Sequence, residues 1–153
     1  MAQAPLLPSA HTRTFCALAA DLGYPSRGYK LHTGGCASDM KDVTPVAGSN
    51  GLNNNLAFYA MGDINKPEKL KRVSLILNIN NPKEQTKAQA ELSRVAIGVA
   101  RKIIGKEPAD LDAVIRNSSS KKWISGKWSI EIKTTKWPTG KGQDTTVHFR
   151  PSK

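Results

Sequence analysis

A strict alternation of side chains over residues 72–79 limits the possible folds of this chain more than any other feature. Every second residue there is apolar: Val73, Leu75, Leu77 and Ile79. A period of two residues predicts a β-strand with one apolar face. That face must meet a core, so the strand belongs to a sheet that is covered on at least one side.

A long helix is predicted directly after this strand. Asn81 can cap it, Pro82 suits the first helical position, and Glu84 can reach back to the amide of the cap. The predicted helix covers residues 82–104 and ends before Gly105. Its apolar stripe contains Ala88, Leu92, Val95, Ala96, Val99 and Ile103. We expect this stripe to lie across the apolar face of the sheet.

The other segments complete an order of α, β, β, β, α, α, β, β. Helical spacing predicts helices over 10–22 and 108–116, and alternation predicts strands over 27–33, 56–61, 127–133 and 146–150. Residues 34–55 are rich in Gly, Asn, Ser, Asp and Pro, which indicates a long loop with a short strand near Val43.

Hairpin-length links between strands favour antiparallel pairing. The prediction is therefore an α+β fold: an antiparallel sheet of four to five strands, with a long helix and one or two shorter helices packed on one face. A chain of 153 residues has the size of one domain. We expect a flexible tail over 1–8 and a single α+β domain over 9–153.

The charge balance indicates the kind of partner. Lys and Arg number 23 against 12 Asp and Glu, which gives a formal net charge of +11. A field of this sign favours anionic partners such as nucleic acid, phospholipid head groups or an acidic protein, although it also serves simple solubility. No stretch approaches the ~20 apolar residues of a membrane helix.

The two cysteines, Cys16 and Cys36, bear on the compartment. In an oxidising compartment they can form a disulfide worth about 3 kcal/mol, whereas in the cytosol they would be two thiols. The start Met-Ala-Gln-Ala-Pro is typical of an initiator Met placed on a mature exported protein. We therefore expect a periplasmic or secreted protein, with a cytoplasmic one as the alternative.

Motifs of known chemistry are absent from the sequence. It lacks the metal-binding His-Glu-x-x-His, paired Cys-x-x-Cys, phosphate-loop and nucleophile-elbow patterns. We expect no catalytic residue, no metal and no cofactor. A Cys36–His32 pair is conceivable as a nucleophile and base, but their spacing matches no known motif.

The segment 133–144 is the strongest candidate for binding. It places Trp137 between Lys136 and Lys141, an arrangement that suits stacking together with attraction of an anion. The alternative is that Trp137 folds back against the edge of the core. With the cations of the adjoining strands, the predicted binding residues are Lys127, Lys133, Lys136, Trp137, Lys141 and Arg150. A second basic cluster, Lys66, Lys69, Lys71 and Arg72, joins the first only if the strand order allows it.

Three functions remain open at this point. The first is an exported binding protein without catalytic activity that engages an anionic polymer or an acidic protein surface. The second is a cytoplasmic nucleic-acid-binding protein that uses the same surface. The third is a small enzyme whose site is assembled from the loop at 34–55.

Overall fold

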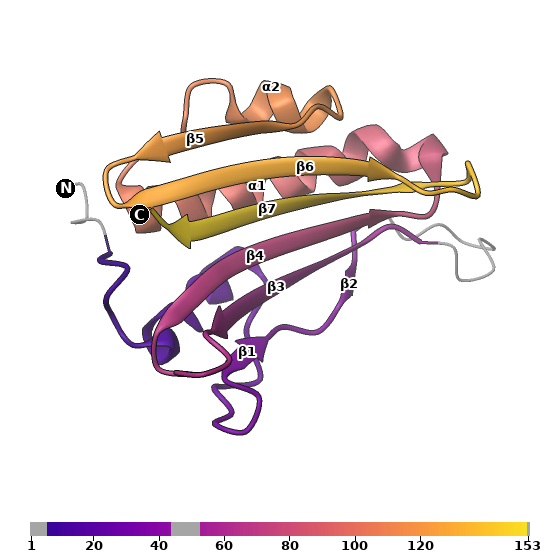
Figure 1. Cartoon of the computed structure of the whole chain (residues 1–153). Helices are drawn as coiled ribbons and strands as arrows, with labels where there is room; N and C mark the ends of the chain where they lie inside the picture. The colour runs from indigo at the N-terminus through magenta and orange to yellow at the C-terminus, as the bar shows by residue number, and fades with distance from the viewer. Residues whose placement is uncertain (1–5, 44–52, 153) are drawn as a thin grey trace.

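The computed structural model describes residues 6–43 and 53–152 and contains one antiparallel sheet (Figure 1). The strand order is β1-β3-β4-β7-β6-β5, with β2 also paired to β3, so the sheet has seven strands. The predicted α+β class is confirmed. The sheet is larger than the expected four to five strands.

The sheet and the helices have the following bounds. The strands are β1 (Gly35–Ala37), β2 (Lys41–Asp42), β3 (Asn55–Gly62), β4 (Leu70–Ile79), β5 (Lys121–Ser125), β6 (Trp128–Lys136) and β7 (Gln143–Pro151). The α-helices are α1 (Gln85–Ile104) and α2 (Leu111–Arg116), and the 3-10 turns are η1 (Thr12–Phe15), η2 (Ala20–Leu22) and η3 (Pro82–Glu84).

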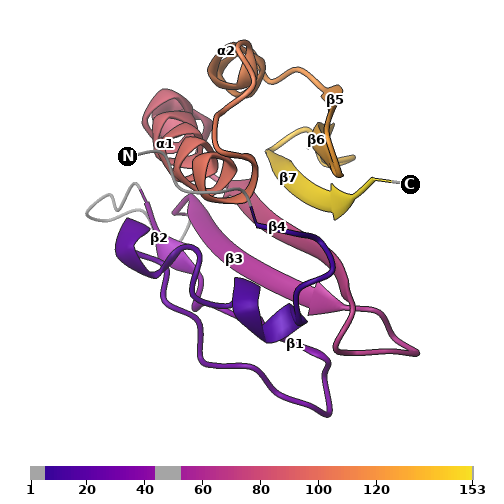
Figure 2. The same cartoon turned by 90° about the vertical axis from the view of Figure 1, so that its left-hand side faces the viewer.

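One face of the sheet is covered by helices (Figure 2). The alternating apolar side chains of β4 and β6 that face the helices, Val73, Leu75, Leu77, Ile79, Trp128, Ile130 and Ile132, are at most 2% exposed, as the alternation predicts. The N-terminal turns lie on the same side of the sheet as α1, where Phe15 packs edge-on against Trp128. Arg94 and Lys102 of α1 donate to the carbonyls of Leu22 and Leu18, which ties the turns to the helix.

The N-terminal segment differs from the prediction. The expected helix over 10–22 is two separate 3-10 turns, and the expected strand over 27–33 is reduced to isolated bridges at Ser26 and Lys30. Phe15, Leu18 and Ala19 of the segment are still buried, whereas Leu31 is exposed. Gly23 in the left-handed conformation and Gly28 with positive φ bend the chain repeatedly. The segment therefore wraps around the sheet edge, and neither regular element is long enough to form.

The strand β5 was not predicted, because residues 118–122 have the composition of a polar loop. β5 is an edge strand, paired only with β6, where Trp123 lies opposite Ile130. Edge strands carry charges more often than central strands, which weakens the alternation signal.

The predicted loop at 34–55 contains β1 and β2, the latter next to Val43 as expected, while residues 44–52 lie outside the described residues.

The chain is held in place by hydrogen bonds from Leu6 onward. The amide of Leu6 donates to the carbonyl of Ile103 at 3.0 Å, and the carbonyl of Leu6 accepts from the indole N–H of Trp128 at 2.9 Å. The predicted flexible tail 1–8 is thus anchored at Leu6, and residues 1–5 lie outside the described residues.

The possible disulfide is present: Cys16 and Cys36 are bonded, with 5.9 Å between their Cα atoms. This bond joins the end of η1 to β1.

Candidate binding surface

The face of the sheet opposite α1, which we call the open face, carries a row of polar side chains across five strands. Cross-strand pairing aligns Tyr59 with Ser74, Ser74 with His148, His148 with Glu131, and Glu131 with Lys122. On β3, β4, β6 and β7 these residues alternate with the apolar residues of the core. The row therefore lies on the opposite side of the sheet from the core.

His148 stands at the centre of this row. Its Nδ1 lies 2.7 Å from Oγ of Ser74. Partial burial lowers the pKa of His148 to about 4, with further lowering by the nearby guanidinium groups of Arg150 and Arg72, while Glu131 acts in the opposite direction. The imidazole is therefore neutral at neutral pH, and the charge of this region comes from the arginines.

The Ser74–His148 pair is poorly suited to nucleophilic catalysis. Ser74 is only 2% exposed, so its hydroxyl offers no room for a substrate. A histidine with a pKa near 4 is also a weak base toward a hydroxyl group. The pair instead satisfies two polar groups beneath the arginine side chains.

Two arginines flank His148 and belong to the two basic clusters seen in the sequence. Arg150 donates to Glu131 at 2.9 Å, and this contact is the main reason that the pKa of Glu131 is lowered. Arg72 lies against Met61, with 3.8 Å between Nη2 and Sδ, and its buried Nε has no acceptor. Because β4 pairs with β7, the two clusters meet here.

The predicted binding residues fall in three places. Lys133 and Arg150 lie on the open face, on β6 and β7. Lys127 lies in the turn before β6, whereas Trp137 and Lys141 lie in the turn after it. A nine-residue strand separates these turns, a span of about 30 Å. Lys136 points to the helix side, where it lines a small hollow together with Gln85 of α1.

Trp137 folds back on its own hairpin. Its indole N–H donates to Asp144 at 2.9 Å, and its amide donates to the carbonyl of Gly142 at 2.9 Å. The ring lies so close to Gly142 that a Cβ there would be 2.6 Å from a ring carbon. The indole is therefore half-buried and already engaged, and it is not a free platform for stacking.

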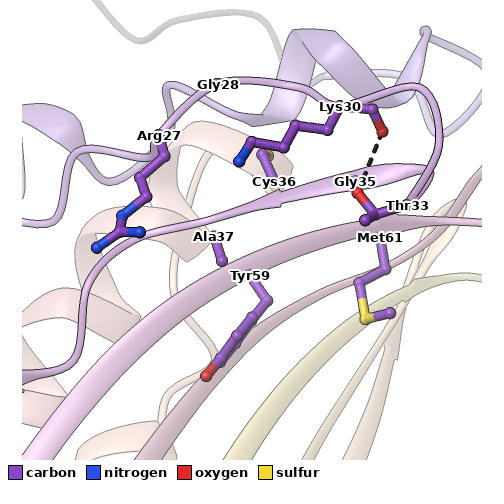
Figure 3. Close-up of a pocket in the computed structure, with 9 residues that line it drawn as sticks. All are labelled: Arg27, Gly28, Lys30, Thr33, Gly35, Cys36, Ala37, Tyr59 and Met61. Atoms are coloured by element: carbon purple, nitrogen blue, oxygen red, sulfur yellow. Dashed lines mark hydrogen bonds between the residues drawn. The ribbon is translucent and has the colours of Figure 1, made fainter.

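A largely apolar hollow of about 280 Å³ lies at the β1 edge of the open face (Figure 3). Figure 3 shows Arg27 and Lys30 on one side of it and Tyr59 and Met61 of β3 on the other. Arg27 is paired with the exposed Asp39. Since Tyr59 also begins the polar row, the hollow and the row form one continuous surface.

Ion pairs are distributed unevenly between the two sides of the sheet. The helix side holds six: Lys87–Glu84, Arg94–Glu91, Arg101–Glu107, Lys102–Asp21, Arg116–Asp112 and Lys121–Asp110. Within the described part of the chain, Arg150 is the only cation of the polar row that is ion-paired, with Glu131, and Arg27 beside the hollow is paired with Asp39. Lys122 and Lys133 are exposed on the open face and form no ion pair with any described residue.

Lys122 and the Ser74–His148 contact were not predicted as parts of this surface, and Arg72 was predicted only within the second basic cluster. Alternation places Arg72, Ser74 and His148 on the outer face of their strands, which was a usable signal. What was lacking was the strand order, since β4 and β7 are far apart in sequence and adjacent in the sheet.

Among the residues that the structure describes, no helix is both long enough and apolar enough to cross a bilayer. The same residues contain no group of three or more His, Cys, Asp or Glu side chains that could hold a metal ion. Comparisons with protein-family models, curated proteins and solved structures find no match for this chain. Sheets backed by helices serve many unrelated functions, so the fold alone does not indicate one.

Proposed function

We propose that this chain is an exported binding protein without catalytic activity that engages an anionic polymer or an acidic protein through the open face. The observation that carries the proposal is the uneven pairing of charge. Most acids of the helix side are consumed in ion pairs, while Lys122 and Lys133 on the open face are exposed and form no ion pair with a described residue, although Glu131 lies opposite Lys122. Unpaired cations gathered on one face attract anionic groups.

The rigidity of the sheet favours this role. Lys122, Lys133 and Arg150 project from three neighbouring strands whose backbones are fixed by the ladder of hydrogen bonds. Charges held on a rigid scaffold lose less conformational entropy on binding than charges on a loop. We therefore assign the binding role to Arg72, Lys122, Lys133 and Arg150. Lys127, Lys136 and Lys141 are not part of this set.

Export is supported by the disulfide. Bonds such as Cys16–Cys36 form and persist in oxidising compartments and are rare in the cytosol. Both cysteines are buried, so the bond is part of the folded core and not a surface feature.

The proposal is tested by titrating the protein with heparin and with polyglutamate at low and high salt. The test variant is Lys122→Glu with Lys133→Glu, and the control is Lys83→Glu with Lys106→Glu. Both pairs change the net charge equally, but the control residues are exposed on the helix side. We expect the test variant to lose at least about tenfold in affinity and the control to lose much less. Equal losses would mean that net charge alone drives binding.

The same titration is repeated with single-stranded and duplex nucleic acid as the ligands. A cytoplasmic nucleic-acid-binding protein would bind single strands or duplex more tightly than heparin, with affinity falling steeply as salt rises. The engaged state of Trp137 weakens this alternative, because stacking on bases requires an accessible aromatic ring.

A further inference from the structure

Three exposed apolar side chains gather at one end of the sheet. Leu31 is 76% exposed, Ile64 is 88% exposed and Met61 is 37% exposed. Exposed aliphatic residues are ordinary when scattered, but a group of them on turns indicates a contact surface. These three belong to the turn at 30–34, the turn at 62–69, and the end of β3.

The two turns are held together and form one structure, which we call the tip (residues 30–34 and 62–69). The amide of Gly62 donates to the carbonyl of Gly34 at 2.7 Å. A Cβ at Gly62 would lie 2.0 Å from the carbonyl oxygen of Pro67, so only glycine permits this approach. The hydroxyl of Thr12 donates to the same carbonyl at 2.8 Å. Both turns lie at the lower end of the molecule in Figures 1 and 2.

Lysines lie on the same turns as the apolar side chains of the tip. Lys30, Lys66 and Lys69 belong to it, and all three are exposed. Its acids are Glu68 and Asp63, and Oδ1 of Asp63 accepts from the amide of Asn65 at 2.8 Å. Lys71 follows at the start of β4 and is also exposed. The tip thus carries exposed aliphatic side chains and exposed lysines on the same two turns.

From this arrangement we infer that the tip docks on an anionic lipid bilayer, with Leu31 and Ile64 inserted below the head groups. Aliphatic side chains enter the acyl boundary, and lysines remain at the level of the lipid phosphates. The hollow beside Met61, lined also by Lys30, opens next to the tip and suits a short stretch of acyl chain. This role goes beyond the proposed binding of polymers or acidic proteins, because it depends on the turns of the tip and not on Arg72, Lys122, Lys133 and Arg150.

The composition of the tip favours lipid over other partners. Protein interfaces concentrate their binding energy in Trp, Tyr and Arg, and leucine is under-represented among such residues. Nucleic acid needs aromatic rings for stacking, but nearby Tyr29 is half-buried against His11 and Arg13. Leucine and isoleucine between lysines match the two forces that hold a protein on an anionic membrane.

The inference is tested by sedimentation with vesicles of phosphatidylcholine alone and with vesicles that also contain phosphatidylglycerol. We expect the protein to bind the second kind and not the first. Leu31→Ser with Ile64→Ser should lower partitioning at least about tenfold, because the burial of each side chain is lost. Ile124→Ser is the matched control, since Ile124 is 72% exposed on β5, and it should leave partitioning unchanged.

Failure of this inference can be told apart from failure of the proposed function by measuring heparin affinity for the same variants. The tip variant should lose vesicle binding and keep its affinity for heparin. Absent binding to anionic vesicles at low salt overturns the membrane role. Equal partitioning of the tip variant and the wild type also overturns it, because adsorption would then be due to net charge alone. All substituted side chains are highly exposed, so the variants should unfold at the same temperature as the wild type.

Discussion

The two faces of this sheet share one backbone but carry different side chains, apolar on one face and mostly polar on the other. On the covered face, apolar side chains of four central strands pack against α1 and the N-terminal turns, and several charges at the rim, among them Arg101 and Lys102, are ion-paired. On the open face, a row of polar residues centres on a neutral histidine between two arginines. The difference teaches that stability is concentrated on one side of the sheet, which leaves the residues of the other side free to serve binding.

The sharpest way to break this comparison is to truncate neighbours on β4 that point to opposite faces. Leu75→Ala leaves a cavity in the covered face and should lower the free energy of unfolding by about 2 to 5 kcal/mol. Ile76→Ala, on the half-buried open face, should cost about 1 kcal/mol. Urea denaturation of both variants measures the contrast. Similar losses would show that the open face is also a packed interior.

The disulfide offers the next largest effect, because it joins η1 of the helix layer to β1 at the sheet edge. Replacing both cysteines, Cys16→Ser with Cys36→Ser, should cost about 3 kcal/mol, since the closed loop then opens in the unfolded chain. Urea denaturation, with reduction of the wild type as a second route, measures the loss. Affinity for heparin should not change, and a parallel loss of affinity would place the disulfide within the binding surface.

The smallest effect concerns His148 and isolates the open face. Its pKa is about 4 in the folded protein and about 6.5 when unfolded, so the unfolded state binds more protons between these values. Stability should therefore fall as the pH falls from 7 to 5, by about 1 kcal/mol after allowance for the partial exposure of the ring. In His148→Gln this part of the decline should vanish. Carboxylates with lowered pKa, such as Glu131, lose their contribution mainly at lower pH.

Bound polyanion should reduce this decline in the wild type. An anion between Arg72 and Arg150 offsets their repulsion of the imidazolium and raises the pKa of His148. NMR titration of the ring with and without heparin follows the change. A pKa that does not move would place the polyanion away from the row on the open face.

Prediction from the sequence succeeded where a local pattern and a burial requirement agree. Every second residue of 72–79 is apolar, with Ile76 as the one apolar residue on the other face, and β4 covers them. Asn81 caps the 3-10 turn η3, which leads directly into α1, and its side chain accepts from the amide of Lys83; Gly105 ends α1 as predicted. Prediction failed over residues 10–33, because helical spacing of Phe15 and Leu18 is compatible with successive 3-10 turns that bury the same residues.

What the sequence by itself determined is which residues are buried and which carry charge, because periodicity and composition are local properties of the chain. Only the tertiary structure decided that β4 lies beside β7, that Arg72 therefore meets Arg150, and that the turn of Leu31 meets the turn of Ile64. Neighbours across strands are chosen by the packing of the whole sheet. No local pattern records that choice, so the surfaces assigned here to polyanions and to lipid emerge only when the chain is folded.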